Sequence, residues 1–88
     1  MNSLAINLPV ATNIQCTESE LIVALSDGRT ISTPLVWFPR LANANANQLA
    51  NYELLGNGEG IHWPELDEDI SVAGLLEGRK SVELSEHR

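Results

Sequence analysis

The chain has 88 residues, of which 43% are hydrophobic and 19% are charged. This length predicts a single domain over residues 1–88, and the composition excludes a disordered chain. The formal net charge of −7 disfavours binding to nucleic acid or to anionic membranes. It would attract a basic protein partner, but the interpretation that we favour is that the charge only keeps a small domain soluble.

The amino terminus and the cysteine content predict a cytoplasmic protein. Residues 1–8 lack the basic and apolar regions of a signal peptide. The apolar runs are the length of a strand, well short of the roughly 20 residues that cross a bilayer. Cys16 is the only cysteine, so no internal disulfide is expected, as is usual in a reducing compartment.

Residues 10–16 begin the expected core, which we place at about residues 10–78. Polar and apolar side chains alternate there, which is the pattern of a half-buried strand. One face of this strand is expected to carry Val10, Thr12, Ile14 and Cys16. The glutamate at position 18 opposes a thiolate and no cation lies nearby, so we expect Cys16 to be apolar filler rather than a reactive thiol.

A second and a third strand are expected to follow as a hairpin. Residues 21–25 form an apolar, β-branched run, and residues 29–33 read as the return strand. Between them stands Asp27-Gly28, a dipeptide that tolerates positive φ and is common in tight hairpin turns.

The pattern changes at Pro34, where we expect a short helical turn over residues 35–38. Proline is well tolerated at a first helical position, whereas Pro39 is expected to break or bend the turn. Leu41 is then expected to return to the core. A short helix over residues 46–51 should follow, because residues 45 and 48 are Asn and Gln, a variant of the capping box.

The remaining elements are a second hairpin and a last helix. Residues 52–55 and 61–63 read as strands, and the three glycines of residues 56–60 predict the turn between them. A helix over residues 72–77 should be capped by Ser71 and stopped by Gly78. Residues 79–88 are expected to form a flexible tail. The fold class is therefore α+β: a small antiparallel sheet of two hairpin units, about five strands, with two or three short helices.

The segment from His62 to Asp69 has the densest group of functional side chains. His62, Asp67 and Asp69 offer nitrogen and oxygen donors that suit manganese, iron or zinc. Their spacing matches no EF-hand and no His-Glu-x-x-His motif. The interpretation that we favour is an acidic turn before a helix, with no metal, no cofactor and no catalytic residue.

The aromatic residues admit two interpretations. Trp37, Phe38 and Arg40 could anchor a partner, since Trp and Arg dominate interface hot spots. The alternative is that the aromatic side chains fill a small core and that Arg40 pairs with Asp67 or Asp69. If they form an interaction surface, it is expected to comprise Trp37, Phe38, Arg40, His62, Trp63, Asp67 and Asp69.

Several blocks of residues occur in an order that resembles a known family. They are Asp27-Gly28-Arg29, Pro34-Leu35, Trp37-Phe38-Pro39-Arg40-Leu41, Gly60-Ile61-His62-Trp63-Pro64, Leu66-Asp67-Glu68-Asp69-Ile70-Ser71-Val72 and Gly74-Leu75-Leu76. Together they resemble the bacterial family called domain of unknown function 2442, over about residues 10–78. The resemblance implies a compact α+β domain with an antiparallel sheet and no defined catalytic residues. It also implies an antitoxin-like role beside a neighbouring small protein.

We therefore expect a non-enzymatic protein-interaction module with a protein partner, and pairing of two copies through an exposed strand edge stays open. Two alternatives are a metal-binding protein or enzyme that uses the region of His62, Asp67 and Asp69, and a transcriptional regulator. Some relatives resemble this domain followed by a helix-turn-helix segment. No such segment is evident here, so we do not expect this chain to bind nucleic acid by itself.

Overall fold

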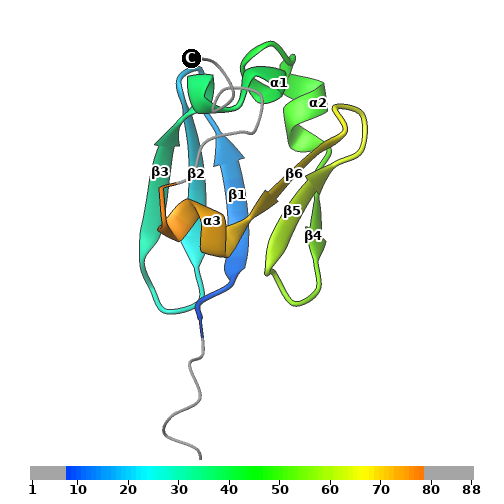
Figure 1. Cartoon of the computed structure of the whole chain (residues 1–88). Helices are drawn as coiled ribbons and strands as arrows, with labels where there is room; N and C mark the ends of the chain where they lie inside the picture. The colour runs from blue at the N-terminus through cyan, green and yellow to red at the C-terminus, as the bar shows by residue number, and fades with distance from the viewer. Residues whose placement is uncertain (1–7, 79–88) are drawn as a thin grey trace, which may run out of the picture.

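Two three-stranded antiparallel sheets form the protein in a computed structural model that describes residues 8–78 (Figure 1). Sheet A has the order β1-β2-β3 and sheet B the order β4-β5-β6. The elements are β1 (Ala11–Cys16), β2 (Glu20–Leu25), β3 (Thr30–Pro34), the 3-10 helix η1 (Leu35–Trp37), α1 (Pro39–Ala42), α2 (Ala46–Ala50), β4 (Glu53–Leu55), β5 (Gly60–Trp63), β6 (Glu68–Ser71) and α3 (Val72–Leu76).

Sheet A is the meander that the sequence predicts, with one irregularity. The pairing of β1 with β2 shifts register between Ala11 and Asn13. Because of this shift, Ala11 and Ile14 are the buried residues of β1, while Thr12 is exposed. The expectation that Val10, Thr12, Ile14 and Cys16 share one face is therefore wrong at Thr12, since a bulge moves side chains between faces. Ile14 and Cys16 both pack in or against the core. In the turn between β2 and β3, Gly28 has a φ of 94°.

The connection between the sheets begins with two separate short helices, η1 and α1, where a single helical turn was expected. Pro34 ends β3 instead of opening a helix, and η1 stops before Pro39. Pro39 then stands in the first turn of α1, where the missing N–H costs nothing. The expected capping box of α2 is present: Asn45 Oδ1 accepts from the backbone N–H of Gln48 at 2.8 Å, and Gln48 Oε1 accepts from that of Asn45 at 3.0 Å.

Sheet B contains a strand that the sequence interpretation missed. The acidic segment expected to be a turn includes the strand β6. In β6, Ile70 pairs with Ile61 of β5 and Asp69 pairs with His62 of β5. The structure therefore has six strands where about five were expected. The hairpin β4–β5 and the last helix are confirmed, with Ser71 Oγ accepting from the backbone N–H of Gly74 at 2.8 Å. The expected tail lies outside the described residues.

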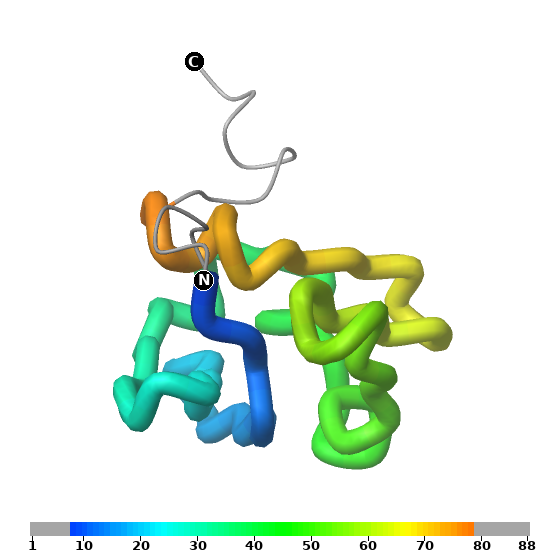
Figure 2. The backbone as a smooth tube through the Cα atoms, turned by 90° about the horizontal axis from the view of Figure 1, so that it is seen from below, coloured from blue at the N-terminus to red at the C-terminus, as the bar shows by residue number. Residues whose placement is uncertain are grey.

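The core lies between the two sheets and is covered at the ends by helices. Its most buried large side chains come from both sheets, from α1 and from α3: Leu21, Val23, Leu41, Ile61, Trp63 and Val72. Seen from below, β6 and α3 cross from sheet B to sheet A (Figure 2). There α3 packs against β3. The chain thus returns to its first sheet and closes the core.

Gly58 forms the direct joint between the sheets at the end of the β4–β5 hairpin. Its carbonyl oxygen accepts from the backbone N–H of Ala11 at 2.7 Å, and the carbonyl of Glu59 accepts from that of Val72 at 2.9 Å. Gly58 is buried and has a φ of 102°. These two bonds tie the tip of sheet B to β1 and to the start of α3.

None of the helices within residues 8–78 combines the length and the apolar character that a bilayer crossing requires.

Candidate functional site

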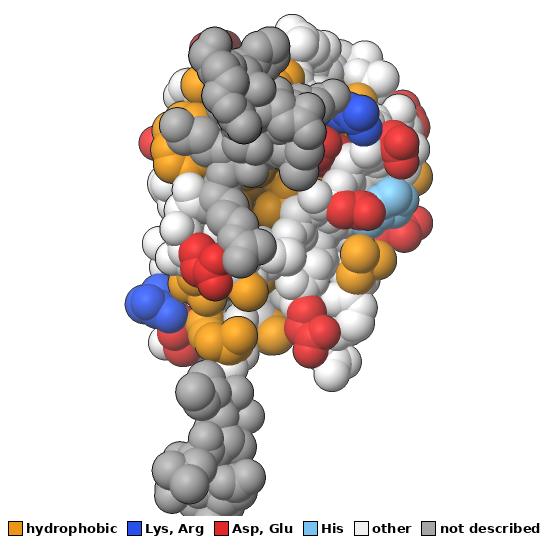
Figure 3. Space-filling model, viewed as in Figure 1, with side chains coloured by type: hydrophobic (Ala, Val, Ile, Leu, Met, Phe, Trp, Pro, Cys, Tyr) orange, Lys and Arg blue, Asp and Glu red, His pale blue; other side chains and the backbone are white. Residues whose placement is uncertain are grey.

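The outer face of sheet B carries a row of three polar side chains, one from each strand. Glu53 on β4 stands opposite His62 on β5, and His62 stands opposite Asp69 on β6. Residues directly opposite one another in an antiparallel sheet point to the same side, and on β5 and β6 the other side is buried. We call Glu53, His62 and Asp69 the outer row. Figure 3 shows the histidine with acidic side chains around it.

Within the outer row, His62 and Asp69 form a hydrogen-bonded pair between Nδ1 and Oδ1. The side chain of Asp69 remains 71% exposed, and that of His62 is 29% exposed. Glu53 is exposed, and its side chain makes no hydrogen bond or ion pair with any residue of the described range 8–78. The row therefore presents two accessible carboxylates with an imidazole held between them.

Asp67 is directed to Arg40 instead of to His62. Arg40 Nη1 donates to the carbonyl oxygen of Asp67 at 2.6 Å and lies 3.8 Å from Asp67 Oδ2. Asp67 has a φ of 52°, which aspartate tolerates better than most residues. The expected pairing of Arg40 with the acidic loop is confirmed. The metal alternative is not supported, because no group of three or more His, Cys, Asp or Glu side chains in residues 8–78 is arranged to hold an ion.

Three of the side chains expected on an interaction surface lie in or against the core. Phe38 is 3% exposed and Trp63 is fully buried, while Trp37 is half-buried against the core. The indole N–H of Trp63 donates to the carbonyl of Leu49 at 3.0 Å, so the end of α2 satisfies its polar atom. Phe38 and Trp63 cannot present their side chains to a partner. Their bulk is needed between the sheets.

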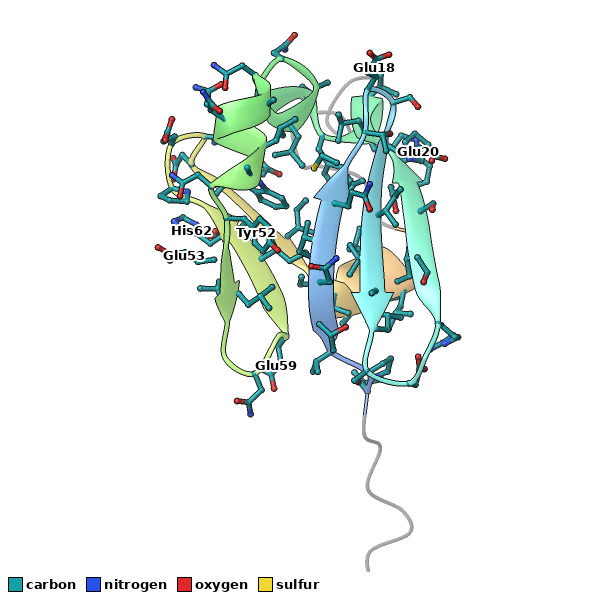
Figure 4. All side chains as sticks on the ribbon, turned by 180° about the vertical axis from the view of Figure 1, so that it is seen from behind. Glu18, Glu20, Tyr52, Glu53, Glu59 and His62 are labelled. Carbon is teal, nitrogen blue, oxygen red and sulfur yellow. The ribbon has the colours of Figure 1, made fainter. Side chains whose placement is uncertain are left out.

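A pocket of about 570 Å³ opens between the end of β1 and helix α2. Its apolar wall consists of Ile14, Cys16, Leu35, Ala42, Ala44, Ala46, Leu49 and Ala50, and its polar lining of Gln15, Thr17, Glu18 and Tyr52. Figure 4 shows Tyr52 between the sheets and Glu18 at the tip of the β1–β2 hairpin. The sequence interpretation missed this pocket because its lining comes from segments far apart in the chain. The run of alternating alanines and asparagines was its one visible signal.

Three polar side chains of the pocket have no partner in the described part of the chain. Gln15, Glu18 and Tyr52 make no hydrogen bond or ion pair there through their side chains. Thr17 differs, because its hydroxyl accepts from the backbone N–H of Glu20 at 2.9 Å and so belongs to the turn. The free polar groups at the edge of an apolar cavity are typical of a ligand site.

Cys16 is predicted to react slowly in the folded protein. It is half-buried at the pocket, and desolvation raises the pKa of its thiol above the ordinary value. Alkylation by iodoacetamide at about pH 8 should be roughly tenfold slower in the native state than in urea, because the thiolate is the nucleophile. Equal rates in the two states would contradict this.

The same shift makes stability depend weakly on alkaline pH. The folded state favours the neutral thiol, so its contribution is fully present below the pKa of the unfolded chain and is lost as the pH rises through the higher pKa of the folded state. Cys16→Ser should remove this part of the alkaline pH dependence.

Comparison with known proteins identifies a matching family and two solved structures with a similar fold. The family model "Protein of unknown function (DUF2442)" matches residues 11–81. A crystal structure of a protein of unknown function from Rhodospirillum rubrum is 34% identical, covering 89% of this chain and 96% of that one, with a TM-score of 0.74. A solution NMR structure of an uncharacterized protein from Chromobacterium violaceum is 27% identical, covering 82% of this chain and 68% of that one, with a TM-score of 0.69.

No functionally curated protein matches the chain. The family match covers most of the 88 residues, in agreement with the resemblance noted from the sequence blocks. The chain belongs to the DUF2442 family of proteins of unknown function.

Proposed function

We propose that this domain is a protein-interaction module that acts by binding a basic protein partner through the outer row on sheet B. The observation that carries the proposal is the pair of exposed carboxylates, Glu53 and Asp69. They stand on the two strands that flank His62, one on each side of it. Lys or Arg side chains of the partner would form charge-assisted hydrogen bonds with these carboxylates.

The charge distribution supports a basic partner. Arg29 and Arg40 are the Lys and Arg residues of the described range, and each is in an ion pair with an aspartate, at 2.8 Å and 3.8 Å. The backbone N–H of Arg29 above all, and then its guanidinium, holds the pKa of Asp27 below its usual value. The cations are thus placed beside carboxylates of their own chain, and an acidic surface steers a positively charged protein towards it.

Charge reversal on the outer row tests the proposal. Immobilised wild-type protein and the double variant E53K/D69K would be incubated with extract of the organism that encodes the chain, and retained proteins would be quantified by mass spectrometry. The matched control is Glu20→Lys, because Glu20 is an exposed carboxylate on sheet A, on the other side of the molecule from Glu53 (Figure 4). Thermal melting of each variant checks that it is folded.

We expect a basic protein that the wild type and Glu20→Lys retain and that the double variant does not. The antitoxin-like version of the proposal predicts that this protein is the product of the adjacent gene and that the domain neutralises it. Binding of the purified pair should weaken as the salt concentration rises, because exposed charges are screened. Retention of the same proteins by the double variant, or of none by the wild type, would contradict the proposal.

A further inference from the structure

The pocket between β1 and α2 is a second candidate site, separate from the outer row. None of Glu53, His62 and Asp69 lines it. Its volume of about 570 Å³ lies within the range of about 300 to 1,000 Å³ that small-molecule sites occupy in proteins. It is also mainly apolar, with alanine side chains leaving room where larger residues would fill the space. A small organic molecule fits these dimensions.

The charge at the pocket selects the sign of the ligand. Glu18 is the one Asp or Glu side chain in its lining, and no hydrogen bond or ion pair within residues 8–78 engages it. No Lys or Arg among residues 8–78 lines the cavity. The thiol of Cys16 stays neutral at physiological pH, since burial raises its pKa. A bound anion would be repelled by Glu18, whereas a cation would find a carboxylate without a partner.

Tyr52 lines the pocket away from Glu18 and offers an aromatic surface there. Its ring packs against that of Trp63 with the centroids 6.3 Å apart and the planes tilted by 52°. Trp63 is itself fixed by burial and by its hydrogen bond to the carbonyl of Leu49. Contact with this fixed ring restricts the orientation of Tyr52. The ring offers apolar contact to the body of a ligand, and the phenol hydroxyl and the Gln15 amide are available as hydrogen-bond partners.

We propose that this pocket binds a small organic amine, in which an apolar body fills the cavity and the ammonium group pairs with Glu18 at its edge. This function is independent of the proposed protein partner, because the two sites share no side chain. Each can fail without affecting the other.

The test compares three probes with one skeleton: 3-phenylpropylamine, the neutral 3-phenylpropan-1-ol and the anionic 3-phenylpropanoate. Each is titrated into ¹⁵N-labelled protein, and the amide shifts are followed by NMR. The amine should shift the amides around Cys16, Leu49 and Tyr52. It should bind about twofold to fivefold more tightly than the alcohol, as one exposed charge pair allows. The carboxylate should bind most weakly.

Two variants with matched controls complete the test. Glu18→Gln should abolish the preference for the amine over the alcohol, while Glu20→Gln on the neighbouring strand should leave it unchanged. Ala50→Leu should fill the pocket and weaken all three probes at least about fivefold, while Ala73→Leu on the exposed side of α3 should not. Equal binding of amine and alcohol to the wild type would overturn the proposal. So would amine shifts centred on the outer row, or no shift at all.

Discussion

Replacing Gly58 with alanine is expected to lower the free energy of unfolding by about 3 kcal/mol or more. An added Cβ would overlap the carbonyl oxygen of Ala11 and lie 3.1 Å from its nitrogen and 3.2 Å from Cβ of Val10. The φ of 102° is also one that side-chain-bearing residues rarely adopt. Backbone cannot yield as a flexible side chain does, so the bond that joins the sheets, from Ala11 N–H to the Gly58 carbonyl, must lengthen or break.

Gly28→Ala is the matched control for this prediction. Gly28 has a similar φ of 94° in the β2–β3 turn, but an added Cβ would meet no atom within 4 Å. Its replacement should therefore cost only the conformational strain, about 1 kcal/mol. Urea unfolding followed by circular dichroism measures both. If the two variants lose equal stability, the joint at Gly58 does not hold the sheets together as described.

Trp63→Phe is expected to lower the free energy of unfolding by about 2 to 3 kcal/mol. Trp63 is fully buried, so the smaller ring leaves a void in a close-packed core. The change also removes the indole donor from the carbonyl of Leu49, which is 3.0 Å away, and an orphaned buried acceptor costs about 1 to 3 kcal/mol. The loss should be visible as a lower urea midpoint with an unchanged slope.

Val36→Ala provides the baseline for Trp63→Phe. Val36 is 68% exposed on η1, and substitutions at such positions change stability by about 0.5 kcal/mol or less. A Trp63→Phe variant as stable as this control would show that Trp63 lies at the surface, and it would restore the interpretation of this side chain as a partner contact.

Local signals in the sequence predicted local structure well. The pair Asn45 and Gln48 predicted the capping box, and Ser71 predicted the cap of α3, because each depends on residues three positions apart. The acidic segment was wrongly predicted to be a turn, because aspartate and glutamate have a low intrinsic preference for strands. Ile70 pairs with Ile61 across β5 and is 6% exposed, so tertiary burial outweighs the local preference and makes β6.

The candidate site shows the same division. The pairing of Arg40 with the acidic loop follows from the scarcity of cations, and it was predicted. The row of Glu53, His62 and Asp69 depends on the register of three strands, and register cannot be obtained while one strand is taken for a turn. The burial of Phe38 and Trp63 agrees with the interpretation that the aromatic side chains fill a small core, although no local pattern specifies how the two sheets face each other.

The outer row is tested most directly by mapping the partner on the protein. Amide shifts of ¹⁵N-labelled protein would be recorded on addition of the basic protein that the wild type retains. The account predicts shifts concentrated on β4, β5 and β6 around Glu53, His62 and Asp69, and no binding by E53K/D69K. Shifts concentrated on sheet A, or unchanged binding by that variant, would contradict it.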